Sequence, residues 1–85
     1  MSVVKKEIDN WDPIGLLSHA PRDEYHSEIE AVEHLLKSSK DLGELAIGIY
    51  SVFLQAFGEV SFQKSLSECR RIAHKILNHG EKHQR

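Results

Sequence analysis

The sequence has only one cysteine and no long uninterrupted apolar run. Cys69 is the only cysteine, so the chain cannot form an internal disulfide, which fits a reducing compartment. The longest apolar run, residues 45–54, is interrupted by Ser51 and is too short to cross a bilayer. No apolar segment follows the lysines near the N-terminus, as one would in a signal peptide. We therefore expect a cytoplasmic protein.

The length of 85 residues leaves room for one hydrophobic core. We expect one helical domain over residues 1–85, with a frayed tail from about residue 80. The apolar share of 40% and the charged share of 28% are typical of a folded globular chain rather than of a disordered one.

Patterns of catalytic and metal-binding residues are missing as well. Cys69 and His74 are five residues apart, which places them roughly 140° apart on a helix, so they would not form a nucleophile–base pair. The six histidines lack the spacing of a zinc site, and one cysteine cannot complete a set of four ligands. The pairs that a metal carrier would use are His26 with His34 and His79 with His83. We expect no enzyme activity, no cofactor and no bound metal.

Charge is divided along the chain, although the net charge is only −2. Residues 1–36 contain three basic and eight acidic side chains, which gives −5. Residues 37–85 contain eight basic and five acidic side chains, which gives +3. Such a division has two specific explanations: helices that attract one another, or an acidic surface that meets a basic partner. The explanation favoured over both is that most of these charged residues solvate the surface.

The spacing of apolar residues predicts a short first helix and a turn after it. Val4, Ile8 and Trp11 recur at spacings of four and three, which marks one face of a helix. Asp12 before Pro13 combines an N-cap residue with a residue favoured at the first helical position. We therefore expect a new helical turn to begin there.

The second helix is predicted to begin at Pro21. Asp23 and Glu24 would lie in its first turn, where the helix dipole favours negative charge. Its apolar stripe is Tyr25, Ile29, Val32 and Leu36. Glu33 is placed to pair with Lys37 one turn later.

The third helix is predicted to be the central one. Asp41 and Glu44 form the pattern of a capping box at its start. Almost every residue from 42 to 57 is apolar, and the exceptions form one narrow stripe of Glu44, Gly48, Ser51 and Gln55. A central helix would have only this stripe near solvent, and the close approach of a neighbouring helix would explain Gly48.

The fourth helix is expected after Gly58, with Ser61 as its N-cap and Gly80 at its end. Its apolar face is Phe62, Leu66, Cys69, Ala73 and Ile76. No segment alternates apolar and polar residues for long enough to form a strand. The predicted fold is therefore all-α: a compact bundle of three main helices plus a short N-terminal helix and an anchored connection, "WDPIGLL".

This connection carries a resemblance to a known family. "WDPIGLL", followed by "APRDEY" and "EI", resembles the YugE-like proteins, a small bacterial family of unknown function. The resemblance continues through "LAIGIYSVFLQAFGE" and covers roughly residues 8–77. It implies a compact helical fold of about this length, but no activity, substrate or catalytic residue. The residues that match its motif are Asp12, Pro13, Gly15, Pro21, Asp23, Glu24 and Tyr25.

The same stretch is interpreted first as a structural clasp and second as a partner surface. Its apolar residues would be buried against the later helices, and the helix-start signals already explain Asp12 and Asp23. The clasp residues are Trp11, Asp12, Pro13, Gly15, Leu16, Leu17, Pro21 and Tyr25.

The predicted function is non-catalytic binding of another protein, and a basic partner would suit the charge. One version is an immunity- or antitoxin-like inhibitor, whose acidic surface would cover a basic toxin site after rapid electrostatic steering. The residues predicted to contact the partner are Asp23, Glu24, Glu28, Glu30 and Glu33.

The alternative function is that of a nucleic-acid-associated regulator. Its contacts would be Lys64, Arg70, Arg71 and Lys75. The acidic first half opposes this alternative, and no helix-turn-helix spacing or phosphate loop accompanies the four cations, so we do not expect a nucleic-acid partner. We expect no membrane binding, because the polar faces carry mixed charge. A homodimer is compatible with either function.

Overall fold

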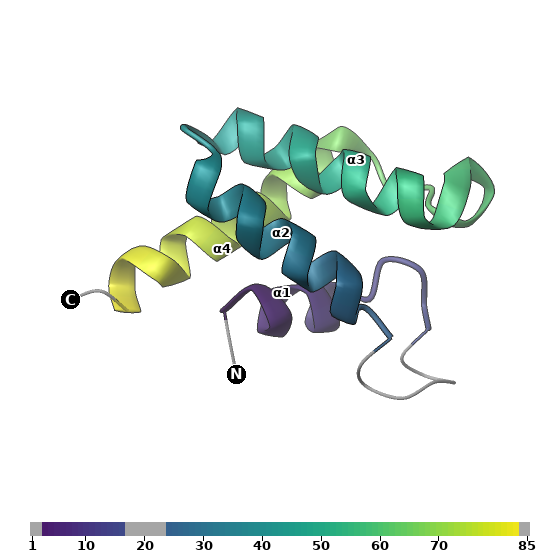
Figure 1. The fold of residues 1–85 in the computed structure, drawn as a ribbon, viewed down its shortest axis with the longest axis horizontal. Coiled ribbons are helices and arrows are strands. Elements are labelled where there is room, and N and C mark those ends of the chain that lie inside the picture. Colours follow the sequence, from purple (N-terminus) through teal and green to yellow (C-terminus); the bar gives the residue numbers. More distant parts are fainter. Residues whose placement is uncertain (1–2, 17–23, 84–85) are drawn as a thin grey trace.

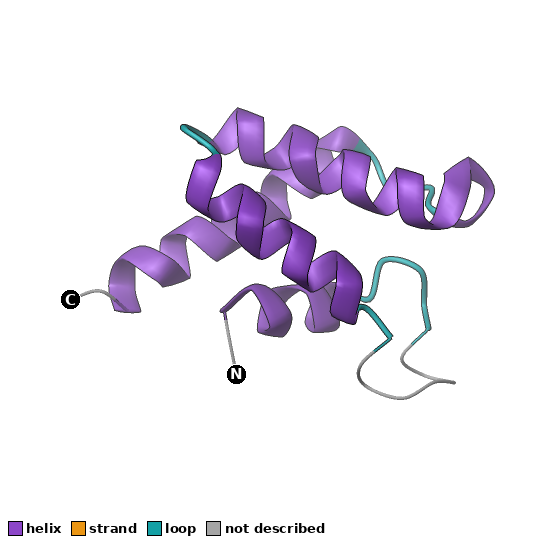
Figure 2. Ribbon diagram, in the orientation of Figure 1, coloured by secondary structure: helices purple, strands orange, loops and turns teal. Residues whose placement is uncertain are grey.

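Four helices make up the regular structure of residues 3–16 and 24–83, which the computed structural model describes, with side chains up to residue 78. The helices are α1 (Val3–Trp11), α2 (His26–Ser38), α3 (Leu42–Ser61) and α4 (Leu66–His83). No strand occurs in these ranges, so the predicted all-α class is confirmed (Figure 2). The predicted clasp and partner residues Leu17, Pro21 and Asp23 lie outside the described residues.

The backbones of four helix pairs lie close together: α1 and α3 each lie beside α2 and α4. Within the described ranges the backbones of α2 and α4 do not approach each other as closely. Figure 1 shows α2 crossing in front of α4, with α3 above them and α1 below.

The core is centred on a cluster of aromatic rings. Phe53 of α3 is fully buried and stacks on Phe57 and Phe62, with ring centroids 6.0 and 5.7 Å away. Trp11 of α1 and Tyr25 meet the ring of Phe53 in edge-on geometry at 5.7 and 5.9 Å. Such pairs add about 0.5–1.5 kcal/mol each beyond the burial of their apolar area, so this cluster holds α1 and the start of α2 against α3.

Helix α3 begins and packs as its sequence predicts. The Glu44 N–H donates to Asp41 Oδ1 at 2.8 Å, and Glu44 Oε1 accepts from the Lys40 N–H at 3.1 Å. At Gly48, a Cβ atom would lie only 2.7 Å from Cδ1 of Leu35 on α2. The close approach of a neighbouring helix therefore explains this glycine, as predicted.

The predicted exposure of α3 is wrong in two respects. Gly48 belongs to the stripe predicted to face solvent, but it lies against Leu35 of α2. Ile47 lies outside the polar stripe, yet 57% of its surface is exposed. The reason is that Ile47 lies on a side of α3 that no other helix covers within the described chain.

Three predicted helix boundaries also need correction. Helix α2 begins at His26 rather than at Pro21, and Tyr25 precedes it. Helix α4 is capped by Ser65, not by Ser61: Ser65 Oγ accepts from the Glu68 N–H at 3.1 Å. Gly80 does not end α4, which continues to His83. A glycine inside a helix lowers the stability of the helix by only about 1 kcal/mol relative to alanine, and it ends the helix where the backbone turns left-handed.

Gly58 is predicted to end the third helix, and its backbone does turn left-handed there. Its φ of 79° interrupts the helical backbone of α3, and one further turn leads to Ser61. Phe62 then lies buried in the connection to α4 rather than in the helix predicted for it.

Candidate functional site

The acidic residues predicted to bind a partner lie on and beside α2. Glu24 and Glu30 are exposed, and Glu28 and Glu33 are half-buried. The ion pair found for this set joins His26 Nε2 to Glu30 Oε2 at 3.6 Å, and both of its side chains are largely exposed. The predicted pair of Glu33 with Lys37 does not form among the described residues. We call Glu24, Glu28, Glu30 and Glu33 the acidic face.

The residues of the nucleic-acid alternative lie on or just before α4. Arg70, Arg71 and Lys75 are exposed, and Lys64 is half-buried in the preceding connection. Two of these four cations approach a carboxylate: Lys64 Nζ and Arg71 Nη2 each lie 3.9 Å from Glu68 Oε2. Glu68 of α4 thus offsets part of the positive charge of Lys64 and Arg71.

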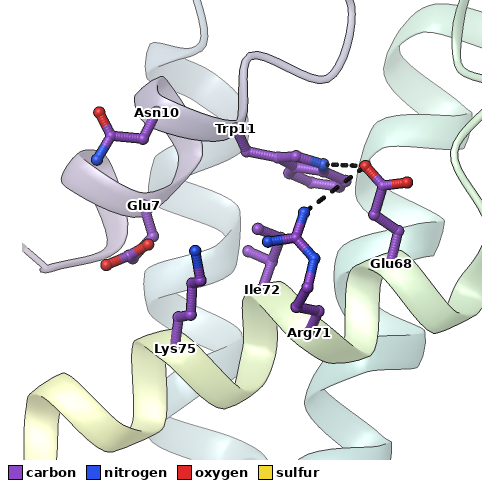
Figure 3. A pocket seen from close by; sticks show the side chains of 7 residues that line it. All are labelled: Glu7, Asn10, Trp11, Glu68, Arg71, Ile72 and Lys75. Atoms are coloured by element: carbon purple, nitrogen blue, oxygen red, sulfur yellow. Dashed lines mark hydrogen bonds and ion pairs between the residues drawn. The ribbon is translucent and has the colours of Figure 1, made fainter.

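Glu68 also belongs to a polar pocket between α1 and α4 (Figure 3). The Trp11 indole N–H donates to Glu68 Oε2 at 2.8 Å, which ties the end of α1 to α4. Lys75 extends from α4 toward α1, on the side of Glu7, a carboxylate that is 5% exposed. The pocket has a volume of about 230 Å³ and is lined by Glu7, Asn10, Trp11, Glu68, Arg71, Ile72 and Lys75.

The size and charge of this polar pocket limit what it can hold. Its volume of about 230 Å³ is below the roughly 300–1,000 Å³ typical of small-molecule sites. Its two carboxylates and two cations balance in formal charge, so no strong field draws an ion of either sign. The observed contacts therefore give the pocket a structural role, which is to attach α1 to α4.

The predicted clasp is organised around a buried hydroxyl. Tyr25 is fully buried, and its O–H donates to Asp12 Oδ1 at 2.6 Å while its oxygen accepts from the Ile14 N–H at 3.1 Å. The same Asp12 oxygen accepts from the Leu16 N–H at 3.0 Å. Burial, and then the hydrogen bond to Asp12, raise the pKa of Tyr25 to about 12.

The backbone of the clasp forms one turn rather than a helix. Asp12 has a φ of 45°, a left-handed conformation that aspartate tolerates better than most residues, and Gly15 has a φ of 78°. The Gly15 N–H donates to the Asp12 carbonyl oxygen at 3.0 Å and closes the turn. The expected helical turn after Asp12 is therefore a single hydrogen-bonded turn, with Pro13 buried in it.

The cysteine and histidine residues do not come together as a reactive group. Cys69 is fully buried, and this burial, with the nearby charge of Glu68, raises the pKa of its thiol to about 11. His74 is exposed, so the two side chains face different surroundings. Within the part of the chain that the structure describes, no three His, Cys, Asp or Glu side chains gather as metal ligands; the side chains of His79 and His83 lie outside that part.

Sequence reasoning missed two groups of these residues. Ser65 and Glu68 have the spacing of a capping box, so the start of α4 could have been found from the sequence. Glu7 and Asn10 give no such signal, because the spacing of residues shows which of them share a face but not which faces of two helices meet.

Over residues 3–83 the chain matches the family described as a domain of unknown function (DUF1871). No curated protein and no solved structure matches the chain. Among the helices of residues 3–16 and 24–83, none is both long enough and apolar enough to cross a membrane.

Proposed function

Because the chain belongs to the DUF1871 family, whose function is unknown, we propose a role from the chain's own surfaces: it is a non-catalytic protein that binds a basic protein partner through the acidic face. The remaining predicted contact, Asp23, lies next to this face in the sequence but outside the described residues.

The observation that carries the proposal is that no ion pair joins α2 to α4 among the described residues. Most surface charges are explained by solvation alone, and the division of charge along the sequence adds two further explanations: attraction between helices, or a surface for a partner. Attraction would pair carboxylates of α2 with cations of α4, but the observed pairs are His26 with Glu30 on α2, and Lys64 and Arg71 with Glu68 at α4. This arrangement favours a partner surface over attraction between the helices.

Repulsion between the carboxylates of the acidic face, which lowers the stability of α2, also supports a partner surface. Like charges three or four residues apart on a helix destabilise it by about 0.2–0.5 kcal/mol per pair, and Glu30 and Glu33 have this spacing. The histidine beside Glu30 offsets the cost only when it is protonated. A surface that costs stability in the free protein is expected where a cationic partner supplies the missing charge.

The narrower form of the proposal is an immunity- or antitoxin-like inhibitor. Such a protein needs no catalytic groups, and its carboxylates would cover a basic toxin site and speed encounter by electrostatic steering. The lone buried cysteine fits a cytoplasmic setting, and the "WDPIGLL" motif fits a place among the bacterial YugE-like proteins.

The test compares two substitutions that change charge equally. A partner is first isolated on the immobilised protein from cytosol, identified, and purified. Its binding is then measured with wild type, with Glu30→Lys on the acidic face, and with Glu59→Lys, an exposed glutamate near the end of α3. We expect Glu30→Lys to weaken binding roughly tenfold or more, mainly through a slower association rate at low salt, and Glu59→Lys to have little effect. Equal affinities for the two variants would refute the proposal.

The nucleic-acid alternative rests on the exposure of Arg70, Arg71 and Lys75 along one helix. If it were correct, binding of duplex DNA or of RNA would fall steeply with salt, and Lys75→Glu would reduce the slope by about one counterion. The absence of binding at low salt would eliminate it.

A further inference from the structure

A second surface, separate from the acidic face, carries exposed apolar side chains. Among the described residues the large exposed apolar side chains are Ile47, Val60 and Leu66, at 57%, 82% and 48%. Ile47 and Leu66 lie on the two sides of a groove of about 200 Å³ between the first turns of α3 and α4. The groove is lined by Gly43, Ala46, Ile47, Leu66, Ser67 and Arg70.

Helix α3 has more apolar side chains than the fold of a single chain buries. The sequence of α3 is that of a helix covered on all sides except one polar stripe. In the structure α2 and α4 lie along α3 and Trp11 of α1 reaches its Phe53, yet Ile47 is left in solvent. Monomeric proteins rarely expose contiguous apolar patches larger than a few hundred Å², and such patches mark interaction sites. Among the described residues nothing covers Ile47, so this part of α3 is available to a partner.

Charges of both signs flank this apolar centre. Glu44 is exposed one turn before Ile47 on α3, and Arg70 is exposed one turn after Leu66 on α4. Arg70 forms no ion pair within the described residues. Its guanidinium lies near the start of α3, with Nη1 4.0 Å from the position that a Cβ atom on Gly43 would occupy. We call Glu44, Ile47, Leu66 and Arg70, with the groove between them, the α3–α4 patch.

We propose that the α3–α4 patch binds a second copy of the same chain in a two-fold dimer. In this dimer Arg70 faces Glu44 of the second copy, and because two-fold symmetry repeats every such contact, Glu44 also faces its Arg70. The same axis, which runs along the groove, packs Ile47 against Leu66 of the second copy and Leu66 against its Ile47. A uniformly acidic or basic partner would meet one like charge in this patch, whereas a second copy meets opposite charges on both sides.

The patch is small for a permanent interface, so the dimer is weak. Stable interfaces bury about 800 Å² on each partner and involve roughly 20–30 residues a side, more than this patch supplies. The dimer therefore forms in a concentration-dependent way, with a dissociation constant in the micromolar range or above.

The first test measures mass against protein concentration by sedimentation equilibrium. Wild type is expected to shift from monomer toward dimer as the concentration rises to the millimolar range. Ile47→Asp should hold the protein monomeric, whereas Val60→Asp, a control at an exposed apolar residue outside the groove, should dimerise as wild type does. Circular dichroism and thermal unfolding establish that each variant is folded.

The second test exchanges the charges. Arg70→Glu and Glu44→Arg should each weaken self-association at least roughly tenfold, because like charges then face each other twice. An equal mixture of the two variants should restore dimerisation, since every facing pair in the mixed dimer is opposite in sign. Arg71→Glu changes the neighbouring arginine, which does not line the groove, and should leave dimerisation unchanged. Glu44→Arg also removes a capping contact of α3, but this loss is the same whether the variant is measured by itself or in the mixture, so it cannot explain a restored dimer.

A wild-type protein that stays monomeric at every concentration overturns the proposal. So does a dimer that survives Ile47→Asp, or one that the mixture of charge variants fails to restore. Because the acidic face shares none of these residues, either result leaves the proposed function to be judged by its own test.

Discussion

Tyr25→Phe is the substitution that most directly tests how the clasp stabilises the fold. It removes one hydroxyl from a fully buried ring, and with it the 2.6 Å hydrogen bond to Asp12 and the acceptor of the Ile14 N–H. A hydrogen bond to a charged group contributes about 1.5–3 kcal/mol, and a buried donor left without a partner adds to the loss. We expect a destabilisation of about 2–3 kcal/mol, which lowers the melting temperature of a domain of this size by roughly 10–20 °C.

Urea unfolding, followed by the fluorescence of the single tryptophan and by circular dichroism, provides the measurement. Tyr50→Phe is the control, because the half-buried Tyr50 contributes its ring to the core and no hydrogen bond of its hydroxyl is found within the described residues. It should change stability by less than about 0.5 kcal/mol. Asp12→Asn should cost about 1 kcal/mol in wild type but much less in the Tyr25→Phe background, because the two residues share one bond. If Tyr25→Phe unfolds like Tyr50→Phe, the buried hydroxyl does not secure the clasp and our reasoning is wrong.

The remaining predictions concern the packing of Gly48, the cap of α4, and the buried groups Cys69 and Tyr25. Gly48→Ala should destabilise the fold by about 1 kcal/mol, because overpacking against Leu35 outweighs the gain in helix propensity; in a Leu35→Ala background it should stabilise instead, and urea unfolding of the four proteins checks the change of sign. Ser65→Ala should cost about 1 kcal/mol, whereas Ser61→Ala should be nearly neutral by the same measurement. At neutral pH Cys69 should react with a thiol reagent at least about a hundredfold more slowly in the folded protein than in urea, since its pKa is raised from 9.0 to about 11; equal rates would show that the thiol is accessible. Cys69 and Tyr25 both hold their protons to higher pH in the folded state than in the unfolded chain, so their contribution to stability is complete below pH 9 and is lost toward about pH 11 for Cys69 and about 12 for Tyr25. Cys69→Ala should remove the earlier part of this loss in unfolding curves recorded at stepped alkaline pH.

The helices themselves could be predicted because each has its own local signal. The spacing of Val4, Ile8 and Trp11 gives α1, and the pair Asp41 and Glu44 gives the start of α3. Gly48 shows that a glycine inside an apolar helix can be read correctly as a point of close approach, since nothing else would justify its cost in helix propensity.

The start of α2 could not be predicted in the same way. Tyr25 has the right spacing to be the first residue of its apolar stripe, yet its hydroxyl is held by Asp12, thirteen residues earlier in the chain. A tertiary contact of this kind overrides a local preference, and the helix begins only at His26. The contact could be guessed from the unusual stretch of sequence, but its geometry depends on where α1 and α3 lie.

The sequence also could not predict which helix faces pack together. Residue spacing places Glu68, Arg71 and Lys75 on one face of α4, and it places Glu7 on α1. Only the packing of α1 on α4 brings these residues around one polar pocket. Likewise, a helix as apolar as α3 looks central, and only its packing shows that Ile47 remains in solvent.

The two proposed surfaces have a consequence together that neither has alone. The acidic face lies on and beside α2, and the α3–α4 patch lies on two other helices, so a dimer formed through the patch leaves both acidic faces accessible. Two linked faces bind a surface that carries many copies of a basic partner more tightly than one face does, because the second binding event becomes intramolecular. Ile47→Asp should therefore weaken retention on a densely immobilised partner while leaving the affinity for a single partner in solution unchanged. A parallel loss in both assays would mean instead that Ile47 contacts the partner itself.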